Sequence, residues 1–137
     1  MCSSDLVIKE TARILIRATQ QYGNHEDFIG HIGGDDFVVV TTPPMVDNIC
    51  QKIITDFDNS APSFYNETDR KNGYITAKDR KGNVQRIPLL SISIGVVTNE
   101  FRTIEHVAQI GEIGAELKSQ VKRLEKSNYL EDKRTAD

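Results

Sequence analysis

A pair of glycines followed by a pair of aspartates, set between two apolar runs, constrains this chain more than any other feature. The motif reads Gly33-Gly34-Asp35-Asp36, and the apolar runs occupy residues 28–32 and 37–40. β-Branched and aromatic residues favour strands, and adjacent glycines supply the positive φ angles that a tight hairpin turn requires. The stretch therefore predicts a β-hairpin whose turn lies at the glycines.

The two adjacent carboxylates of this turn point to a function. Like charges repel, so folding alone does not require both Asp35 and Asp36. A divalent cation that carries polyphosphate does require such groups, because Mg²⁺ prefers one or two carboxylates beside phosphate oxygens. Gly33 and Gly34 also leave space for a ligand to approach the backbone. The simpler alternative is a hairpin turn without chemistry, since a short motif is a hypothesis until its context is checked.

The composition is typical of a soluble globular domain. With 137 residues the chain is long enough for one domain, residues 1–137, and too short for two ordinary ones. No apolar run approaches the roughly 20 residues that cross a bilayer, and the first residues lack a signal-peptide pattern. Cys2 and Cys50 give no disulfide framework, which predicts a cytoplasmic location. A net charge of −3 argues against nucleic acid as a partner.

Apolar spacing predicts helices and strands on both sides of the hairpin. A helix over 5–21 begins at Asp5 as N-cap and ends before Gly23. Pro43 and Pro44 end the second hairpin strand and open another helix. Residues 58–72 are expected to be irregular. The remaining predicted elements are strands at 73–78, 84–88, 89–97 and 128–130, and a long helix capped by Thr103.

The last predicted helix combines an apolar stripe with a basic face. The stripe consists of Val107, Ile110, Ile113, Leu117, Val121 and Leu124. The basic face consists of Lys118, Lys122, Arg123 and Lys126. Cations near a helix C-terminus are favoured by the helix dipole, so a solvated face is the generic interpretation of these charges.

The segment Gly33-Gly34-Asp35-Asp36-Phe37 resembles the signature of the GGDEF family, the diguanylate cyclases, whose usual motif is Gly-Gly-Asp/Glu-Glu-Phe at a β-hairpin. The Ser-Ile-Gly run at residues 93–95 is similar to one that family members carry. The resemblance implies an α/β fold, an α+β sandwich whose mainly antiparallel central sheet is covered by helices. That arrangement is similar to the palm of nucleotidyl cyclases and polymerases.

The resemblance also implies an activity. Members condense two GTP into cyclic di-GMP and two pyrophosphates, as homodimers that use Mg²⁺ or Mn²⁺ and act in signal transduction. An upstream sensory or receiver domain usually controls them. Asp35 matches the metal-binding acidic position, and Asp36 stands where a catalytic, metal-binding glutamate is usual. Asp36 is one methylene shorter than glutamate, which alters transition-state geometry more than binding.

Further residues match the substrate-binding positions of the family. Asp5 falls on the aspartate that binds the guanine base, and Gly33 and Gly34 would admit the phosphates. Lys122 and Lys126 fit the spacing of two basic residues that bind the phosphates. The Arg-x-x-Asp product-binding site appears only as its aspartate, Asp27, which we expect to be a solvated loop residue. Asn24 replaces its arginine and lacks the charge that holds a phosphodiester.

The resemblance lacks the beginning of the family's domain. The usual first strand and helix, with a motif close to Asp-x-Asp-x-Phe-Lys-x-x-Asn-Asp, have no counterpart here. That strand is normally central, so a gap is expected between the strands at 89–97 and 37–40. Without its metal-binding aspartate, we expect the chain as given to be inactive.

Two alternatives stay open at this point. A degenerate GGDEF module can sense nucleotides or dimerise without catalysis, and Asn24, Asp36 and the absent upstream carboxylate favour that interpretation. The palm of the large CRISPR effector subunit has a motif that ends Gly-Gly-Asp-Asp. Phe37 and the Ser-Ile-Gly run favour the GGDEF family over that palm.

Overall fold

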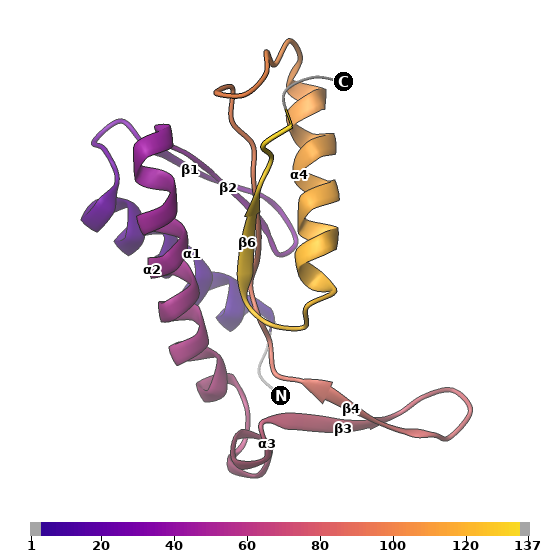
Figure 1. Cartoon of the computed structure of the whole chain (residues 1–137). Coiled ribbons are helices and arrows are strands. Elements are labelled where there is room, and N and C mark those ends of the chain that lie inside the picture. Colours follow the sequence, from indigo (N-terminus) through magenta and orange to yellow (C-terminus); the bar gives the residue numbers. More distant parts are fainter. Residues whose placement is uncertain (1–3, 135–137) are drawn as a thin grey trace.

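Figure 1 shows the computed structural model of the chain, which describes residues 4–134. Helical segments and groups of strands follow one another along it. The elements are α1 (Ser4–Tyr22), β1 (Phe28–Gly33), β2 (Asp36–Val40), η1 (Pro43–Met45), α2 (Val46–Ser60), η2 (Ala61–Phe64), α3 (Glu67–Asn72), β3 (Tyr74–Lys78), β4 (Val84–Pro88), β5 (Ser93–Val96), α4 (Val107–Lys122) and β6 (Asn128–Glu131).

The first helix runs close to its predicted bounds. Asp5 lies inside its first turn rather than at the N-cap, because α1 already includes Ser4. The helix ends where the Gly23 amide donates to the Thr19 carbonyl at 2.8 Å. A Cβ on Gly23 would lie 2.1 Å from the Asp27 carboxylate, so only glycine lets the chain turn toward β1 here.

The main core lies between α1 and α2, which cross and contact each other (Figure 1). Its fully or nearly buried side chains are Ile14, Leu15, Ala18, Ile49, Ile53, Phe57, Ala61, Phe64 and Tyr65. Each large apolar side chain buried in this way contributes about 1.5–3 kcal/mol. Phe37, Val39, Ile92 and Ile94 pack against the same core, so strands β2 and β5 share one apolar support.

The segment after α2 is helical, and the prediction of an irregular stretch at 58–72 was wrong. α2 continues to Ser60, and η2 and α3 follow it. Asn66 caps α3 by accepting from the Asp69 amide at 2.8 Å, and Gly73 ends it at φ 79°. The segment is polar because α3 has no buried residue, and apolar periodicity could not reveal it.

Within residues 4–134 the strands form three separate two-stranded sheets rather than one central sheet. β1 pairs antiparallel with β2, and β3 pairs antiparallel with β4 as predicted. In Figure 1 the β3–β4 hairpin projects away from the helices. The third sheet joins β5 to β6 in parallel, from Ser93 opposite Asn128 to Val96 opposite Glu131.

No ladder joins β2 to β5 among the described strands, in line with the gap expected there. The strand predicted at 89–97 is confined to Ser93–Val96, because only this part has a partner strand. Just before β5, side-chain hydroxyl groups accept hydrogen bonds from the backbone in place of a neighbouring strand. The Leu90 amide donates to the Tyr65 hydroxyl at 3.0 Å, and the Ile92 amide donates to Ser127 Oγ at 2.9 Å.

The last helix covers β5 and β6 (Figure 1). It begins at Val107 with His106 as N-cap, so the predicted cap at Thr103 was wrong. Ile113, Leu117 and Val121 are buried, but Val107, Ile110 and Leu124 at the ends of the predicted stripe are exposed. A Cβ on Gly95 would lie 2.8 Å from the Gly114 carbonyl oxygen, so this small residue lets α4 approach the sheet closely.

The mixed α+β class is confirmed, whereas the single central sheet is not observed. No helix among residues 4–134 is both long and apolar enough to span a membrane. The elements that form the candidate site are the β1–β2 turn and the C-terminal half of α4.

Candidate functional site

The candidate site is the turn between β1 and β2. Gly33 pairs with Asp36, and Gly34 and Asp35 form the turn between them. Gly34 has φ 54° and Gly33 has φ 154°, values that residues with a Cβ rarely adopt. A Cβ added to either glycine would meet no atom within 4 Å. The glycines are therefore needed for backbone conformation, and the space beside them is open.

His31 supports the turn from within β1. Its Nε2 lies 2.8 Å from the Gly34 carbonyl oxygen, so this nitrogen carries the proton and donates. The imidazole also stacks on the Phe37 ring, with 4.6 Å between ring centroids. Both contacts are local to the hairpin, so they give this histidine a structural role in the turn.

Asp36 contacts a distant part of the chain. Its Oδ1 lies 3.1 Å from Nζ of Lys118 on α4, 82 positions later in the sequence. The pair is partly open to solvent, with 54% of the Asp36 side chain and 33% of the Lys118 side chain exposed. This contact joins the acidic turn to the helix that carries the predicted phosphate-binding lysines.

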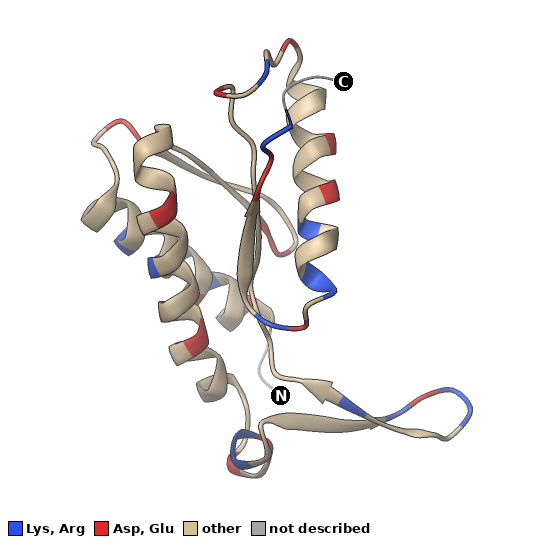
Figure 2. Cartoon of the chain, viewed as in Figure 1, with Lys and Arg blue, Asp and Glu red and all other residues tan. Residues whose placement is uncertain are grey.

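Figure 2 shows the acidic tip of the β1–β2 hairpin beside the basic C-terminal turns of α4. Lys122 lies four residues after Lys118, so the two share one face of the helix. Both Lys122 and Lys126 are exposed, and Lys126 follows the end of α4. The turn and the first predicted lysine are thus on neighbouring elements, with Lys118 as the contact between them.

The other predicted site residues have no such contact. Asp35 is exposed at the tip of the turn, and Asp5 is exposed in the first turn of α1. No hydrogen bond or ion pair joins Asp5 to the turn in the described part of the chain. Base recognition by Asp5 therefore gains no support from a contact.

The turn offers two exposed carboxylates, Asp35 and Asp36, as candidate ligands of a Mg²⁺ ion that also binds phosphate. Asp35 and Asp36 supply two carboxylates, and Mg²⁺ takes its other ligands from phosphate and water when it carries a nucleotide. The Lys118 ammonium already occupies a cation position at Asp36, which indicates that this carboxylate accommodates positive charge. Residues 4–134 contain no group of three or more carboxylate, histidine or cysteine side chains that could hold a metal alone.

Asp27 has a structural role and is not the solvated loop residue that the sequence predicts. Its carboxylate accepts from the Asn24 amide at 2.8 Å and from the Thr41 hydroxyl at 2.9 Å. The Asn24 side chain donates to it as well. Burial opposes the charge of Asp27, but these hydrogen bonds outweigh burial and hold its pKa below the usual range. The residues in the family's product-binding position therefore bind each other and tie the start of β1 to the end of β2.

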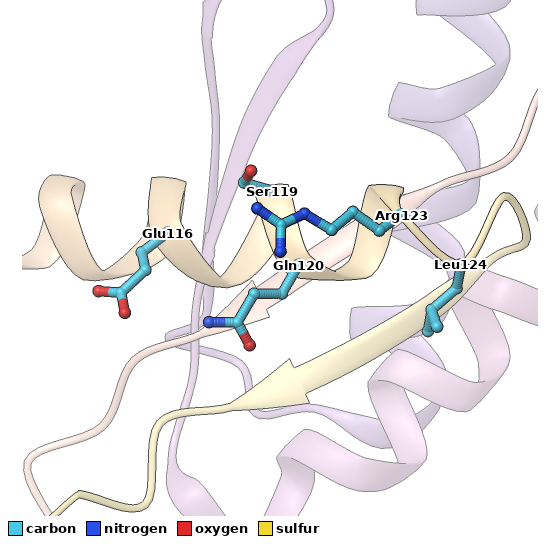
Figure 3. A pocket seen from close by; sticks show the side chains of 5 residues that line it. All are labelled: Glu116, Ser119, Gln120, Arg123 and Leu124. Carbon is cyan, nitrogen blue, oxygen red and sulfur yellow. The ribbon is translucent and has the colours of Figure 1, made fainter.

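A surface hollow of about 480 Å³ lies along another face of α4. It is lined by Glu116, Ser119, Gln120, Arg123 and Leu124. Figure 3 shows the Gln120 and Arg123 side chains lying near each other in this hollow. Glu116 is paired with Arg134 through contacts of 3.2 and 3.3 Å. The hollow is separate from the β1–β2 turn, because its helical positions lie on a different face from Lys118 and Lys122.

Asp132 forms a second acidic centre, which is buried. Its Oδ2 lies 2.7 Å from Nη2 of Arg102, and its Oδ1 accepts from Nε of Arg134 at 2.7 Å. Burial opposes ionisation of Asp132, but hydrogen bonds from Arg134 and Arg102 outweigh it and hold the pKa below its usual range. The carboxylate joins the loop after β5, the end of β6 and, through Arg134 and Glu116, helix α4.

Cys50 is not a candidate nucleophile. Burial in α2, together with the carboxylates of Asp47 and Glu131, raises the pKa of its thiol to about 12. The thiolate is the reactive form, so this buried side chain acts as a small core residue. Cys2 lies outside the described residues.

Comparisons with known proteins do not identify the chain. No protein-family model matches it, and no curated protein or solved structure matches it. The GGDEF resemblance therefore rests on the motif and its sequence context.

Sequence reasoning missed Lys118. It was grouped with the solvated basic face, whereas it contacts Asp36. The available signal was its place one helical turn before Lys122, since residues four apart share a helix face. What the sequence could not reveal is that this face meets the β1–β2 turn.

Proposed function

We propose that this chain is a GGDEF-type module that binds the phosphates of GTP, with Mg²⁺ or Mn²⁺, between the β1–β2 turn and helix α4. The observation that carries the proposal is the contact of Asp36 with Lys118, which sets the acidic β1–β2 turn beside a basic helix face. Carboxylates for a metal and ammonium groups for phosphates are the two charges that a metal–nucleotide complex requires.

Each residue of the turn has a distinct part in this proposal. Asp35 and Asp36 hold the metal, while the open space beside Gly33 and Gly34 admits phosphate oxygens close to the backbone. Lys122, with Lys126, binds the phosphates from the end of α4. When bound, the metal activates the attacking 3′-hydroxyl and neutralises the pyrophosphate that leaves. His31 keeps the turn in the required conformation through the Gly34 carbonyl.

A protein that contains this module together with the upstream strand and helix would act as a homodimer that condenses two GTP into cyclic di-GMP. It would lie in the cytoplasm, under the control of an upstream sensory or receiver domain. Neither nucleic acid nor a membrane is a partner in this proposal.

A second candidate function is a non-catalytic module that senses a nucleotide or dimerises. The favouring observation is that residues 4–134 bring no third carboxylate to Asp35 and Asp36. We therefore expect the chain as given to bind metal and nucleotide weakly and to make no cyclic di-GMP.

The test compares the 137-residue chain with a version extended upstream by a strand and a helix. Both are incubated with Mg²⁺ and either labelled GTP or labelled ATP, and products are separated chromatographically. We expect cyclic di-GMP from the extended version alone. Equal production by both would contradict the need for an upstream carboxylate, and no product from either would favour the non-catalytic module. Cyclic oligoadenylate from ATP would indicate the CRISPR-type palm instead.

Asp35→Ala in the extended version should abolish turnover, because it removes a metal ligand while the glycines keep the turn. Glu26→Ala is the matched control, since it removes an exposed carboxylate from the loop before β1. Circular dichroism should show both variants folded. Normal turnover by Asp35→Ala would refute the metal assignment.

A further inference from the structure

We infer that Lys118 is an internal counter-ion that occupies the cation position at Asp36 when the site is empty and moves to the phosphates when a metal–nucleotide complex binds. The inference rests on the proposed function and adds a residue and a coupling to it. Lys118 is then a positioning residue that makes metal binding depend on the nucleotide.

The contact geometry supports a replaceable counter-ion. The Lys118 ammonium is 3.1 Å from a single carboxylate oxygen of Asp36, and about a third of its side chain is exposed. An ammonium at that distance holds the same oxygen that a metal ion would use. Because exposed ion pairs contribute little free energy, a divalent cation can displace the ammonium at low cost.

The position of Lys118 on α4 supports its second role. Lys122 lies on the same helix face one turn nearer the C-terminus, where we propose that phosphates bind. A lysine side chain is long and its ammonium has three donors that rotate freely. A Lys118 ammonium released from Asp36 would remain on the helix face that carries Lys122, where we propose that phosphates bind.

The contrast with Asp132 strengthens this interpretation. Asp132 is buried and held by two arginines, so its charge is permanently compensated. Asp36 instead has one flexible lysine and remains half exposed. Asp36 therefore lacks the burial and the second partner that hold Asp132 in place, and its carboxylate stays accessible to another cation.

The inference predicts opposite effects of one substitution on two ligands. Lys118→Met removes the ammonium but keeps the length and the helix propensity of the side chain. Mn²⁺ alone should bind about 2–5-fold more tightly, because the competing ammonium and its repulsion are gone. GTP with Mg²⁺ should bind about 3–10-fold more weakly, because the phosphates lose a charged donor.

The experiment measures both affinities on the 137-residue chain. Free Mn²⁺ is followed by its paramagnetic resonance signal, and GTP with Mg²⁺ by amide shifts in nuclear magnetic resonance spectra. The control is Lys81→Met, which removes one positive charge from the β3–β4 turn, a segment that projects away from α4. Lys118→Arg, which keeps the charge, should retain GTP affinity within about twofold.

The outcomes separate this inference from the proposed function. Tighter Mn²⁺ binding together with weaker GTP binding in Lys118→Met, and neither change in Lys81→Met, supports the inference. If the unmodified chain binds both ligands but Lys118→Met changes them in the same direction or not at all, the inference fails and the proposed function stands. If the unmodified chain binds neither ligand, both are overturned.

Discussion

The chain has two acidic centres that meet basic side chains, and they differ in almost every physical respect. At Asp132 the carboxylate is only 1% exposed and two arginines hold it, from the loop after β5 and from the end of β6. At the β1–β2 turn, Asp36 is half exposed and meets a single lysine, with Asp35 open to solvent beside it. The Asp132 centre is closed to ligands, and we call it the closed centre. At the β1–β2 turn the carboxylate oxygens are accessible to a ligand, and we call it the open centre.

The comparison teaches that the number and burial of partners distinguish a structural carboxylate from a candidate ligand. A buried charge must be fully compensated, since desolvation costs several kcal/mol per ion, on the order of any gain from pairing. An exposed carboxylate is solvated by water and can exchange one cation for another. Asp27 belongs with Asp132 in this respect, because neighbouring backbone and side-chain groups satisfy its carboxylate.

The largest expected effect comes from breaking the closed centre. Asp132→Asn should lower the free energy of unfolding by about 3–5 kcal/mol, because it removes the buried negative charge that faces Arg102 and Arg134. Urea denaturation at neutral pH measures the change. Asp36→Asn is the matched control, and equal losses in the two variants would contradict the distinction drawn between the centres.

Acid should weaken the ion pairs of Asp132 and the hydrogen bonds of Asp27 together. Both carboxylates have pKa values lowered in the folded state, so their contribution is complete above the unfolded value of about 3.9. As the pH falls, the unfolded chain binds protons first, and this contribution is lost through the folded pKa values. We expect the free energy of unfolding to decline from about pH 5 downward.

Variants sharpen this pH prediction. Asp27→Asn and Asp132→Asn should each show a shallower decline in acid than the unmodified chain, because each lacks one proton-linked group. Thermal unfolding monitored between neutral pH and about pH 3 measures the slopes. A decline that is unchanged in both variants would show that other carboxylates cause it.

Breaking the open centre should have a small effect on stability. Lys118→Met and Asp36→Asn should each change the free energy of unfolding by less than about 1 kcal/mol, the usual range for partly exposed ion pairs. Urea denaturation again measures the change. A loss as large as that for Asp132→Asn would assign Asp36 a structural role and weaken its candidacy as a metal ligand.

Salt should produce the smallest effect and still separate the centres. Raising the ionic strength screens exposed charges but affects buried pairs much less. The difference in stability between the unmodified chain and Lys118→Met should shrink toward zero at about 1 M sodium chloride, while the difference for Asp132→Asn should persist. A persistent difference for Lys118→Met would indicate packing by the lysine stem.

The local elements can be predicted from the order of the residues alone. The hairpin at Gly33 and Gly34, helices α1 and α2, the β3–β4 hairpin and the last short strand follow from periodicity and from turn residues. These signals are local, since they depend on backbone conformations and on spacing within one element. The polar helix α3 was not predicted, because it buries no apolar face. Thr103 was predicted as the N-cap of the last helix, but α4 begins later, at Val107.

Which elements contact one another depends on the three-dimensional packing of the chain. The division into three small sheets, the parallel pairing of β5 with β6, and the contact of Asp36 with Lys118 join residues far apart in sequence. Likewise, Asp132 and Arg102 belong to separate loops, and no spacing rule relates them. Such contacts depend on how amphipathic faces pack in three dimensions. A single sequence shows which face of an element is apolar, but it does not show which other element that face contacts.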